Sequence, residues 1–199
     1  MEWPKHRLTD DHDPHVQKWI CENTHPKDVF YDIGANTGIM SRVALKITTR
    51  VYAFEPNPDA YDVLVGHDKH PKDALMVALW NQDKPLRLQF PVMWCSGQVE
   101  VHDNEEGYKI AGYRLDTIRP EVGWPKPKIV KSDTQGSEGR WLQGARDSLS
   151  DCDTMILEFW EDGLIAHGTK PSEMIDLLTD YGFEIVDKIS SDILVKRIK

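Results

Sequence analysis

The chain has 199 residues, of which 40% are hydrophobic and 29% are charged, and this length suits a single domain spanning residues 1–199. The formal net charge of −9 and the lack of a lysine- or arginine-rich stretch disfavour a nucleic-acid acceptor, because phosphate binding usually requires a basic stripe. No apolar run is long enough to cross a membrane, no secretion signal is evident, and the three cysteines are scattered singly, so we expect a cytoplasmic protein with reduced thiols.

Residues 1–27 predict an N-terminal arm and one short amphipathic helix. Asp13 can cap this helix, and Pro14 suits its first turn. The apolar residues on one helical face, which predict the buried side, are Val16, Trp19 and Ile20.

Apolar strands then alternate with amphipathic helices. Runs rich in β-branched and aromatic residues predict buried strands at 29–31, 51–54, 74–79, 129–132 and 154–159. Helical spacing of apolar residues predicts helices over 39–47, 57–65, 141–145 and 171–181. Two final strands, 183–186 and 193–195, are expected to pair antiparallel.

The segment 81–127 departs from this alternation. It shows a two-residue apolar period, as at Leu86 and Leu88, and no helical pattern. We expect a β-rich insertion above the sheet and interpret it as a cap on the acceptor side of the site. A cover for a sheet edge or a homodimer contact is the alternative.

The order of elements predicts an α/β fold. Strands that alternate with helices form right-handed units around a mostly parallel sheet. We therefore expect a doubly wound, Rossmann-like sheet of seven strands that ends in a C-terminal antiparallel pair. Such sheets bind ligands beyond the carboxyl ends of their strands, so the residues that follow each strand are the candidates for chemistry.

The turn after the first strand carries the pattern Asp32-x-Gly34-x-x-x-Gly38. Glycines allow the backbone to approach a ligand closely. A dinucleotide fingerprint would place a glycine where Asn36 stands, so a pyrophosphate would lack its usual path. Asp32 suits an ammonium group, and the glycine turn suits a carboxylate. S-adenosylmethionine carries both groups.

Glu55 follows the second strand, 21 residues after Gly34. A carboxylate at this place can accept both ribose hydroxyls of a nucleoside. The third strand ends at Ala78–Trp80, where an adenine would lie. The predicted residues of an S-adenosylmethionine site are Asp32, Gly34, Ala35, Asn36, Thr37, Gly38, Glu55, Pro56, Ala78, Leu79, Trp80 and Asp133.

Several segments together resemble the FkbM-type methyltransferases. They are F-Y-D-I-G-A-N-T-G (30–38), V-Y-A-F-E-P-N-P (51–58), V-A-L-W-N-Q-D (77–83), Y-R-L-D-T-I (113–118), K-I-V-K-S-D-T-Q-G-S-E (128–138), W-L-Q-G-A (141–145) and I-L-E-F (156–159). The resemblance covers most of the chain between residues 29 and 186. It implies a class I methyltransferase fold, S-adenosylmethionine as donor, and O-methylation of a hydroxyl on a sugar or natural product.

The chain departs from that family after its fourth predicted strand. The family typically has K-I-D-V-E-G there, whereas residues 131–136 are K-S-D-T-Q-G. Asp133 and Glu158 end neighbouring strands, and we predict that they are catalytic, with Asp133 the first choice as base or as a contact to the methionine moiety. The alternative makes Asp133 a turn cap and Glu158 a buried partner of Lys131 or Arg140.

Other predictions concern the acceptor and the metal. Aromatic and polar side chains near the strand ends predict an acceptor surface formed by Trp94, His102, Tyr108 and Trp160. Two carboxylates could instead hold Mg²⁺, but no third ligand is evident, so no metal is expected. The competing functions are a methyltransferase acting on nucleic acid or protein, a non-catalytic cofactor-binding module, and an NAD-dependent oxidoreductase.

Overall fold

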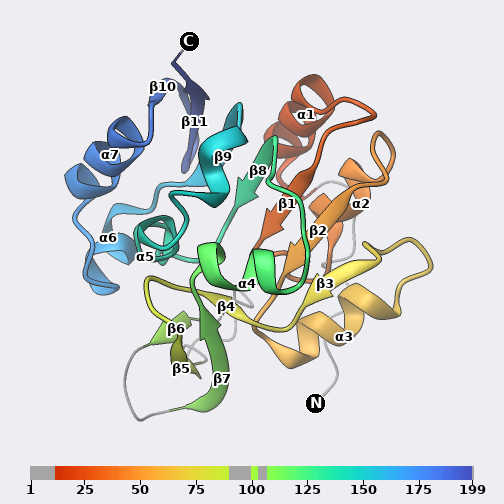
Figure 1. Ribbon diagram of the computed structural model, residues 1–199, viewed down its shortest axis with the longest axis horizontal. Coiled ribbons are helices and arrows are strands. Elements are labelled where there is room, and N and C mark those ends of the chain that lie inside the picture. The colour runs from red at the N-terminus through yellow and green to blue at the C-terminus, as the bar shows by residue number, and fades with distance from the viewer. Residues whose placement is uncertain (1–11, 90–99, 103–106, 199) are drawn as a thin grey trace.

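The computed structural model describes residues 12–89, 100–102 and 107–198. Its main sheet has the strand order β10-β11-β9-β8-β1-β2-β3 (Figure 1). The strands are β1 (Phe30–Ile33), β2 (Val51–Phe54), β3 (Asp73–Leu75), β8 (Ile129–Ser132), β9 (Thr154–Glu158), β10 (Phe183–Ile189) and β11 (Asp192–Arg197). Strands β3, β2, β1, β8 and β9 are parallel, and β11 runs antiparallel to both its neighbours. The predicted seven-stranded sheet with a C-terminal antiparallel pair is confirmed.

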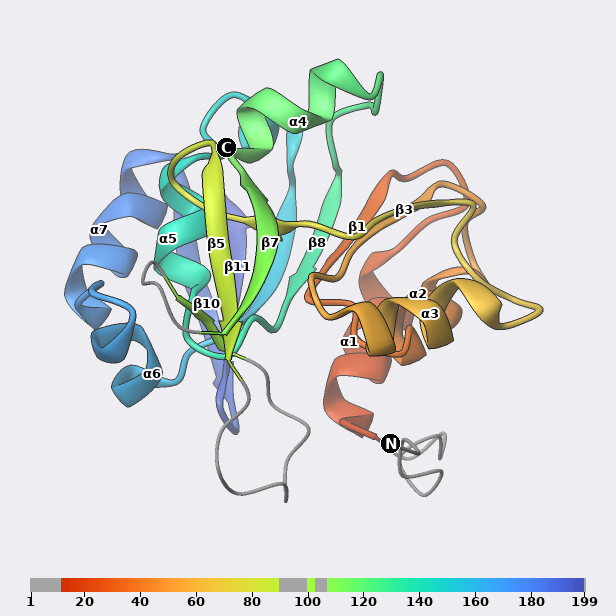
Figure 2. The same cartoon turned by 90° about the horizontal axis from the view of Figure 1, so that it is seen from below.

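Helices cover both faces of this sheet (Figure 2). One face holds α1 (Pro14–Asn23), α2 (Ile39–Ala44) and α3 (Pro58–Gly66). The opposite face holds α4 (Leu115–Glu121), α5 (Glu138–Gln143) and α7 (Pro171–Asp180), and α6 (Glu161–Ala166) contacts α7. Side chains alternate along β1, so Phe30 packs with α1 and α2 whereas Tyr31 and Ile33 join the opposite core. None of the described helices is both long and apolar enough to cross a membrane.

The N-terminal helix matches its prediction except at the cap. Pro14 is its first residue, and the three apolar residues of the predicted face are buried. Asp13, however, has a left-handed backbone (φ 44°), and its side chain caps no helical N–H. Instead its carboxylate lies 2.9 Å from His12 Nε2.

The insertion and the strand β4 that precedes it form a second sheet with the order β4-β7-β5-β6. Its strands are β4 (Ala78–Leu79), β5 (Lys84–Gln89), β6 (Glu100–His102) and β7 (Tyr108–Tyr113). The β-rich character is confirmed, but the predicted strand 74–79 is divided, because β3 joins the main sheet and β4 joins the small one. The small sheet reaches α5 through Asn81 Nδ2, which donates to Gln143 Oε1 at 2.9 Å.

The expectation that 81–127 contains no helix was wrong, because α4 lies within it. This helix is only seven residues long and carries Pro120 near its end, so its sequence shows no full apolar period. Tertiary contacts hold it: Leu115 and Ile118 are buried, and the Asp116 carboxylate accepts hydrogen bonds from the backbone N–H groups of Asp147 and Ser148.

The carboxyl ends of β1 and β8 approach so closely that only glycine fits at position 34. Gly34 has φ +71°, and a Cβ atom placed there would lie 2.0 Å from the Asp133 carbonyl oxygen. Gly123 has nearly the same φ, +72°, but a Cβ atom placed on it would have no heavy atom within 4 Å. The two glycines therefore separate the cost of the backbone conformation from the cost of the close approach.

We expect Gly123→Ala to lower the free energy of unfolding by about 1–2 kcal/mol, the cost of a left-handed alanine. Gly34→Ala should cost more than about 4 kcal/mol, because the β8 backbone must also move. Urea unfolding of both variants measures this difference. Equal losses would show that the two strand ends are not packed as described.

Candidate functional site

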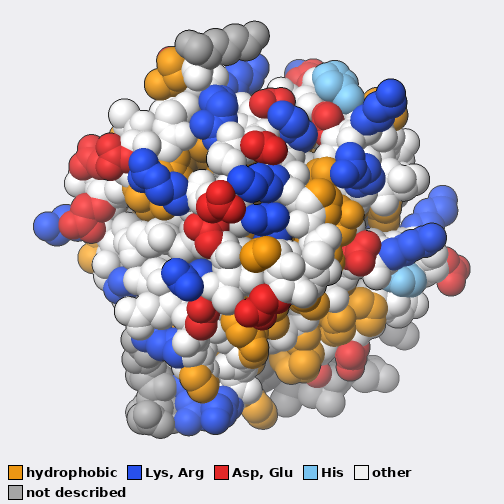
Figure 3. All heavy atoms as spheres, in the orientation of Figure 1, with side chains coloured by type: hydrophobic (Ala, Val, Ile, Leu, Met, Phe, Trp, Pro, Cys, Tyr) orange, Lys and Arg blue, Asp and Glu red, His pale blue; other side chains and the backbone are white. Residues whose placement is uncertain are grey.

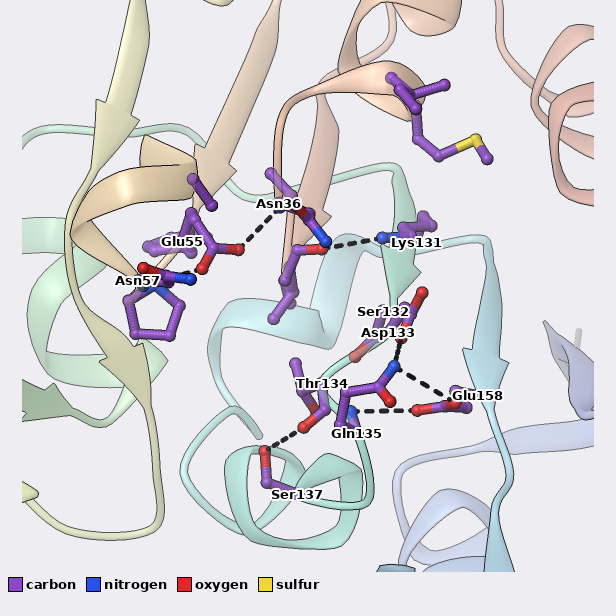
Figure 4. A pocket seen from close by; sticks show the side chains of 18 of the residues that line it. Asn36, Glu55, Asn57, Lys131, Ser132, Asp133, Thr134, Gln135, Ser137 and Glu158 are labelled. Atoms are coloured by element: carbon purple, nitrogen blue, oxygen red, sulfur yellow. Dashed lines mark hydrogen bonds between the residues drawn. The ribbon is translucent and has the colours of Figure 1, made fainter. Parts of the chain in front are cut away.

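A cavity of about 290 Å³ lies at the carboxyl ends of the parallel strands. The residues at the ends of β1, β2, β4, β8 and β9 line it, together with the first residue of β11 and the beginning of α1. This is the edge at which a doubly wound sheet binds its ligands. Figure 4 shows the side chains that converge there.

The turn Gly34–Thr37 forms one wall of the cavity and is fastened to β2. The N–H groups of Gly34 and Ala35 donate to the Phe54 carbonyl at 2.9 and 3.0 Å. Asn36 has φ +51°, and its N–H donates to Glu55 Oε2 at 2.7 Å. The Asn36 amide, where a dinucleotide fingerprint places a glycine, is therefore already bound to a carboxylate.

Glu55 lies in the cavity wall where the sequence predicted it. Its Oε1 atom accepts a second hydrogen bond, from Asn57 N–H at 2.8 Å, and the residue is only 6% exposed. Burial raises the pKa of this carboxyl to about 7, although the hydrogen bonds from Asn57 and Asn36 oppose the shift. The carboxylate is thus fixed in orientation and poorly solvated, and it has lone pairs left for ligand hydroxyls.

Asp32 is fully buried and does not line the cavity. Lys131 Nζ lies 3.2 Å from Asp32 Oδ1 and donates to the Gly34 carbonyl at 3.0 Å, while Ser41 Oγ donates to Asp32 Oδ2 at 2.7 Å. Burial lowers the pKa of the Lys131 ammonium, but the charges of Asp32 and Asp133 outweigh it and keep the pKa above its ordinary value. The Lys131 ammonium is therefore the partner of Asp32, the carboxylate that the sequence pattern assigned to the ammonium group of a ligand.

The structure brings together the two predicted catalytic carboxylates, with Gln135 between them (Figure 4). Gln135 Nε2 donates to Asp133 Oδ1 at 2.5 Å and lies 3.5 Å from Glu158 Oε1. The Gln135 backbone N–H donates to Glu158 Oε2 at 3.0 Å. Arg140 donates to the His167 carbonyl instead, so neither it nor Lys131 is the partner of Glu158.

Glu138 holds the loop that carries these groups, and its role could not be read from the sequence. Its Oε1 accepts from the Thr134 N–H and hydroxyl at 2.5 and 2.6 Å, and its Oε2 accepts from Gly136 N–H at 3.0 Å. Burial raises its pKa to about 7. The only sequence signal was its place within the family-like segment 128–138.

The far side of the cavity is formed by two segments that are distant in sequence. His12, Asp13 and Val16, at the beginning of α1, line it together with Ser191 and Asp192. His15 Nε2 lies 2.7 Å from Asp192 Oδ2, so the start of α1 is joined to the start of β11. No local pattern predicts this contact between residues 177 positions apart.

Of the remaining predicted cofactor residues, Ala35, Asn36, Thr37, Pro56, Ala78 and Leu79 line the cavity. Gly38 and Trp80 do not. Gly38 precedes α2 with φ +84°, and a Cβ there would meet Leu64. Trp80 is buried in a small core with Leu86 and Leu88 of the second sheet.

The predicted acceptor residues are not brought to the cavity by the described part of the chain. Tyr108 is 66% exposed on β7, and Trp160 precedes α6 and is 37% exposed. Neither lines the cavity. Trp94 and the His102 side chain lie outside the described residues. Among the described residues, no group of three or more His, Cys, Asp or Glu side chains is arranged to hold a metal ion.

Comparison with known proteins gives a family and a fold. The family model described as "Methyltransferase FkbM domain" matches residues 32–185. The hexuronic acid methyltransferase AglP of Haloferax volcanii is 27% identical over 168 residues, which cover 83% of this chain and 67% of that protein.

Among solved structures, the FkbM methyltransferase of Methylobacillus flagellatus superposes with a TM-score of 0.54 at 14% identity over 90% of this chain. The chain spans 50% of the length of that protein. Magnesium protoporphyrin IX methyltransferase of Synechocystis, solved with S-adenosylmethionine bound, gives a TM-score of 0.54 at 14% identity, covering 97% of this chain and 80% of that one. At these identities the likeness concerns the fold.

Glu158 is the most perturbed carboxyl of the site. Burial raises its pKa to about 10, and the charges of Asp133, Glu138 and Asp192 add to the shift. An acid whose pKa is raised on folding stabilises the native state below its unfolded pKa, and this stability is lost as the pH rises through the folded pKa. For Glu158 that window runs from its ordinary value of 4.5 to about 10.

We therefore expect Glu158→Gln to stabilise the ligand-free protein above about pH 5, with a gain over wild type that widens as the pH rises towards 9. Urea unfolding at several pH values measures the gap, and the exposed neighbour Glu161→Gln provides the control. Parallel stability curves for Glu158→Gln and wild type would contradict the assignment.

Proposed function

The chain belongs to the FkbM methyltransferase family, and we propose that it transfers a methyl group from S-adenosylmethionine to a hydroxyl of a carbohydrate or similar small molecule. The observation that carries the proposal is the buried Glu55 carboxylate at the end of β2, held by two backbone N–H groups beside the turn after β1. This arrangement fits the ribose diol of a nucleoside donor.

The rest of the donor-side wall fits the other parts of the molecule. Ala78, Leu79 and Pro56 offer an apolar surface for adenine. In the turn after β1, the N–H groups of Gly34 and Ala35 donate to Phe54 and that of Asn36 donates to Glu55, which leaves the Thr37 N–H for the carboxylate. A pyrophosphate lacks one backbone donor of its usual site, because the Asn36 N–H already donates to Glu55. These features favour S-adenosylmethionine over NAD.

When bound, S-adenosylmethionine would supply a methyl group attached to a positively charged sulfur. Transfer of the methyl group to an acceptor oxygen would break the carbon–sulfur bond and leave a neutral thioether. The protein's part is to align the acceptor and receive its proton. We assign proton removal to Asp133, whose Oδ1 is fixed by Gln135 Nε2. Glu158 has a raised pKa and is protonated at neutral pH, so it serves as a hydrogen-bonding group rather than a base.

A carbohydrate acceptor is supported by the Haloferax volcanii relative, whose name specifies a hexuronic acid. A nucleic-acid acceptor is disfavoured by the net charge of −9. On the face shown in Figure 3, Lys and Arg side chains are interspersed with Asp and Glu rather than gathered in one basic patch. The Asp133 carboxylate in the cavity argues for catalysis rather than for a binding module alone.

Glu55→Gln should weaken the binding of S-adenosylhomocysteine by about 10–100-fold, because hydrogen bonds to a charged acceptor are lost. Calorimetry measures this, and wild type should show no comparable binding of NAD. The wild-type affinity should also fall below about pH 7, where Glu55 becomes protonated, and this dependence should vanish in the variant.

The exposed Glu121→Gln is the matched control and should behave as wild type. Unchanged affinity in Glu55→Gln would remove Glu55 from the donor site. Tight binding of NAD by the wild type would contradict the assignment of the donor.

Asp133→Asn should bind S-adenosylhomocysteine within about tenfold of wild type but lose about 100-fold or more in turnover, as expected when a base is removed. Methyl transfer to glycosides measured by mass spectrometry tests this, with the exposed Asp176→Asn as control. If the variant lost donor binding and kept its turnover, Asp133 would be a positioning contact to the donor instead.

A further inference from the structure

The cavity continues beyond the part assigned to the donor. One half is formed by the ends of β1, β2 and β4, where the proposed donor contacts lie. The other half lies over β8, β9 and β11 and is closed by the beginning of α1. None of the described residues of 81–127 lines either half, so the inner wall of the second half is built without the small sheet.

The carboxyl groups of this second half are held in place by strand pairing and by a contact with α1. Asp192 is the register partner of Glu158 in the antiparallel pair of β11 and β9, so their side chains lie on the same face of the sheet. That face is the one that α1 covers, since Ile156, two residues before Glu158, packs with Val16 and Ile20. The contact between His15 and Asp192, at 2.7 Å, then joins the helix to the strand.

The charged groups of this wall are mainly acidic. Its carboxyl groups are those of Asp13, Asp133, Glu158 and Asp192. Glu158 is protonated at neutral pH, so the aspartates supply the negative charge. The positive charge of Lys131 is matched by Asp32, and that of His12, whose pKa is raised by its hydrogen bond to Asp13, is matched by Asp13. No arginine is among the described residues that line the cavity. Burial raises the pKa of Asp192, and the charge of Asp133 adds to it, as it does for Glu158. A further negative charge would therefore be opposed here.

The hydrogen-bonding groups of this half also include more acceptors than free donors. Gln135 lines this half, and its buried Oε1 atom has no hydrogen-bond partner among the described residues. Its Nε2 is already used by Asp133. The oxygens of the aspartates and an unpaired amide oxygen favour a ligand that brings donors, such as hydroxyl or ammonium groups. The carboxylate group of a uronate brings only acceptors, and among the carboxyl groups of this half protonated Glu158 has a single O–H to set against them.

We propose that the half of the cavity formed by Asp13, Asp133, Gln135, Glu158 and Asp192 is the acceptor subsite and that it selects neutral or amino sugars over uronic acids. This inference rests on the proposed function and narrows its substrate class. It also separates the chain from the Haloferax volcanii relative, whose name specifies a hexuronic acid.

The test uses matched methyl glycosides in the gluco, galacto and manno configurations. Each sugar is compared in three forms: the parent hexoside, the uronate, and the uronamide, which has the shape of the uronate without its charge. Binding to the full chain saturated with S-adenosylhomocysteine is measured by calorimetry at pH 7.5, and methyl transfer is measured separately by mass spectrometry. The hexoside and the uronamide of the preferred configuration should each have a Kd about tenfold or more below that of the uronate.

Asp192→Asn should reduce this preference at least about threefold while donor affinity stays within about twofold, since a charge is removed without a change in shape. Asp13→Asn is the second variant, in case the loss of the His15 contact disturbs the fold. The exposed Asp187→Asn, on the neighbouring strand β10, should leave the preference unchanged.

A uronate that binds more tightly than its uronamide would overturn the inference and leave the proposed function intact. Equal binding of the two forms would overturn it as well. If no glycoside bound or accepted a methyl group while S-adenosylhomocysteine did bind, the carbohydrate acceptor and the subsite would both be overturned. Absence of donor binding would overturn the proposed function itself.

Discussion

The ion pair between Asp32 and Lys131 is the interaction around which the site is arranged. The two residues are register partners on β1 and β8, and both are withdrawn from water. Lys131 also binds the Gly34 carbonyl, and Asp32 also binds Ser41 of α2, so one buried pair connects two strands, a turn and a helix. A buried pair is costly to break because the remaining charge has no solvent. Its position makes Asp32 part of the framework.

The carboxyl groups around this pair are held in an environment that opposes their charge. Burial raises the pKa of Glu55 and Glu138 to about 7, and Glu158 is shifted further. Such groups lower the stability of the empty protein at neutral pH, and a cationic ligand would relieve them. Of these, Glu55 and Glu158 line the cavity, and perturbed carboxyls that converge in one cavity are characteristic of functional sites. The donor that we propose carries positive charge on its sulfur and its amino group.

The framework of the fold was predictable, because apolar strands that alternate with amphipathic helices are compatible with few architectures. Glu55 was also predictable, since its place follows from the end of β2. The Lys131 contact to Asp32 required the register of β1 and β8, and the His15 contact to Asp192 required the packing of α1 on β11. Trp80 does not line the cavity, because it packs in the core of the small sheet, to which β4 belongs. A cytoplasmic location and a homodimer stay predictions of the sequence.

Equilibrium urea unfolding of wild type and Asp32→Asn, each with and without saturating S-adenosylhomocysteine, tests the role of the buried pair. The variant should lose about 3 kcal/mol of stability in both conditions, because Lys131 loses its partner. The stability added by the ligand should be the same in both proteins, because that increment depends on ligand affinity. An unchanged stability of the empty variant, together with loss of the ligand increment, would show that Asp32 contacts the donor and is not part of the framework.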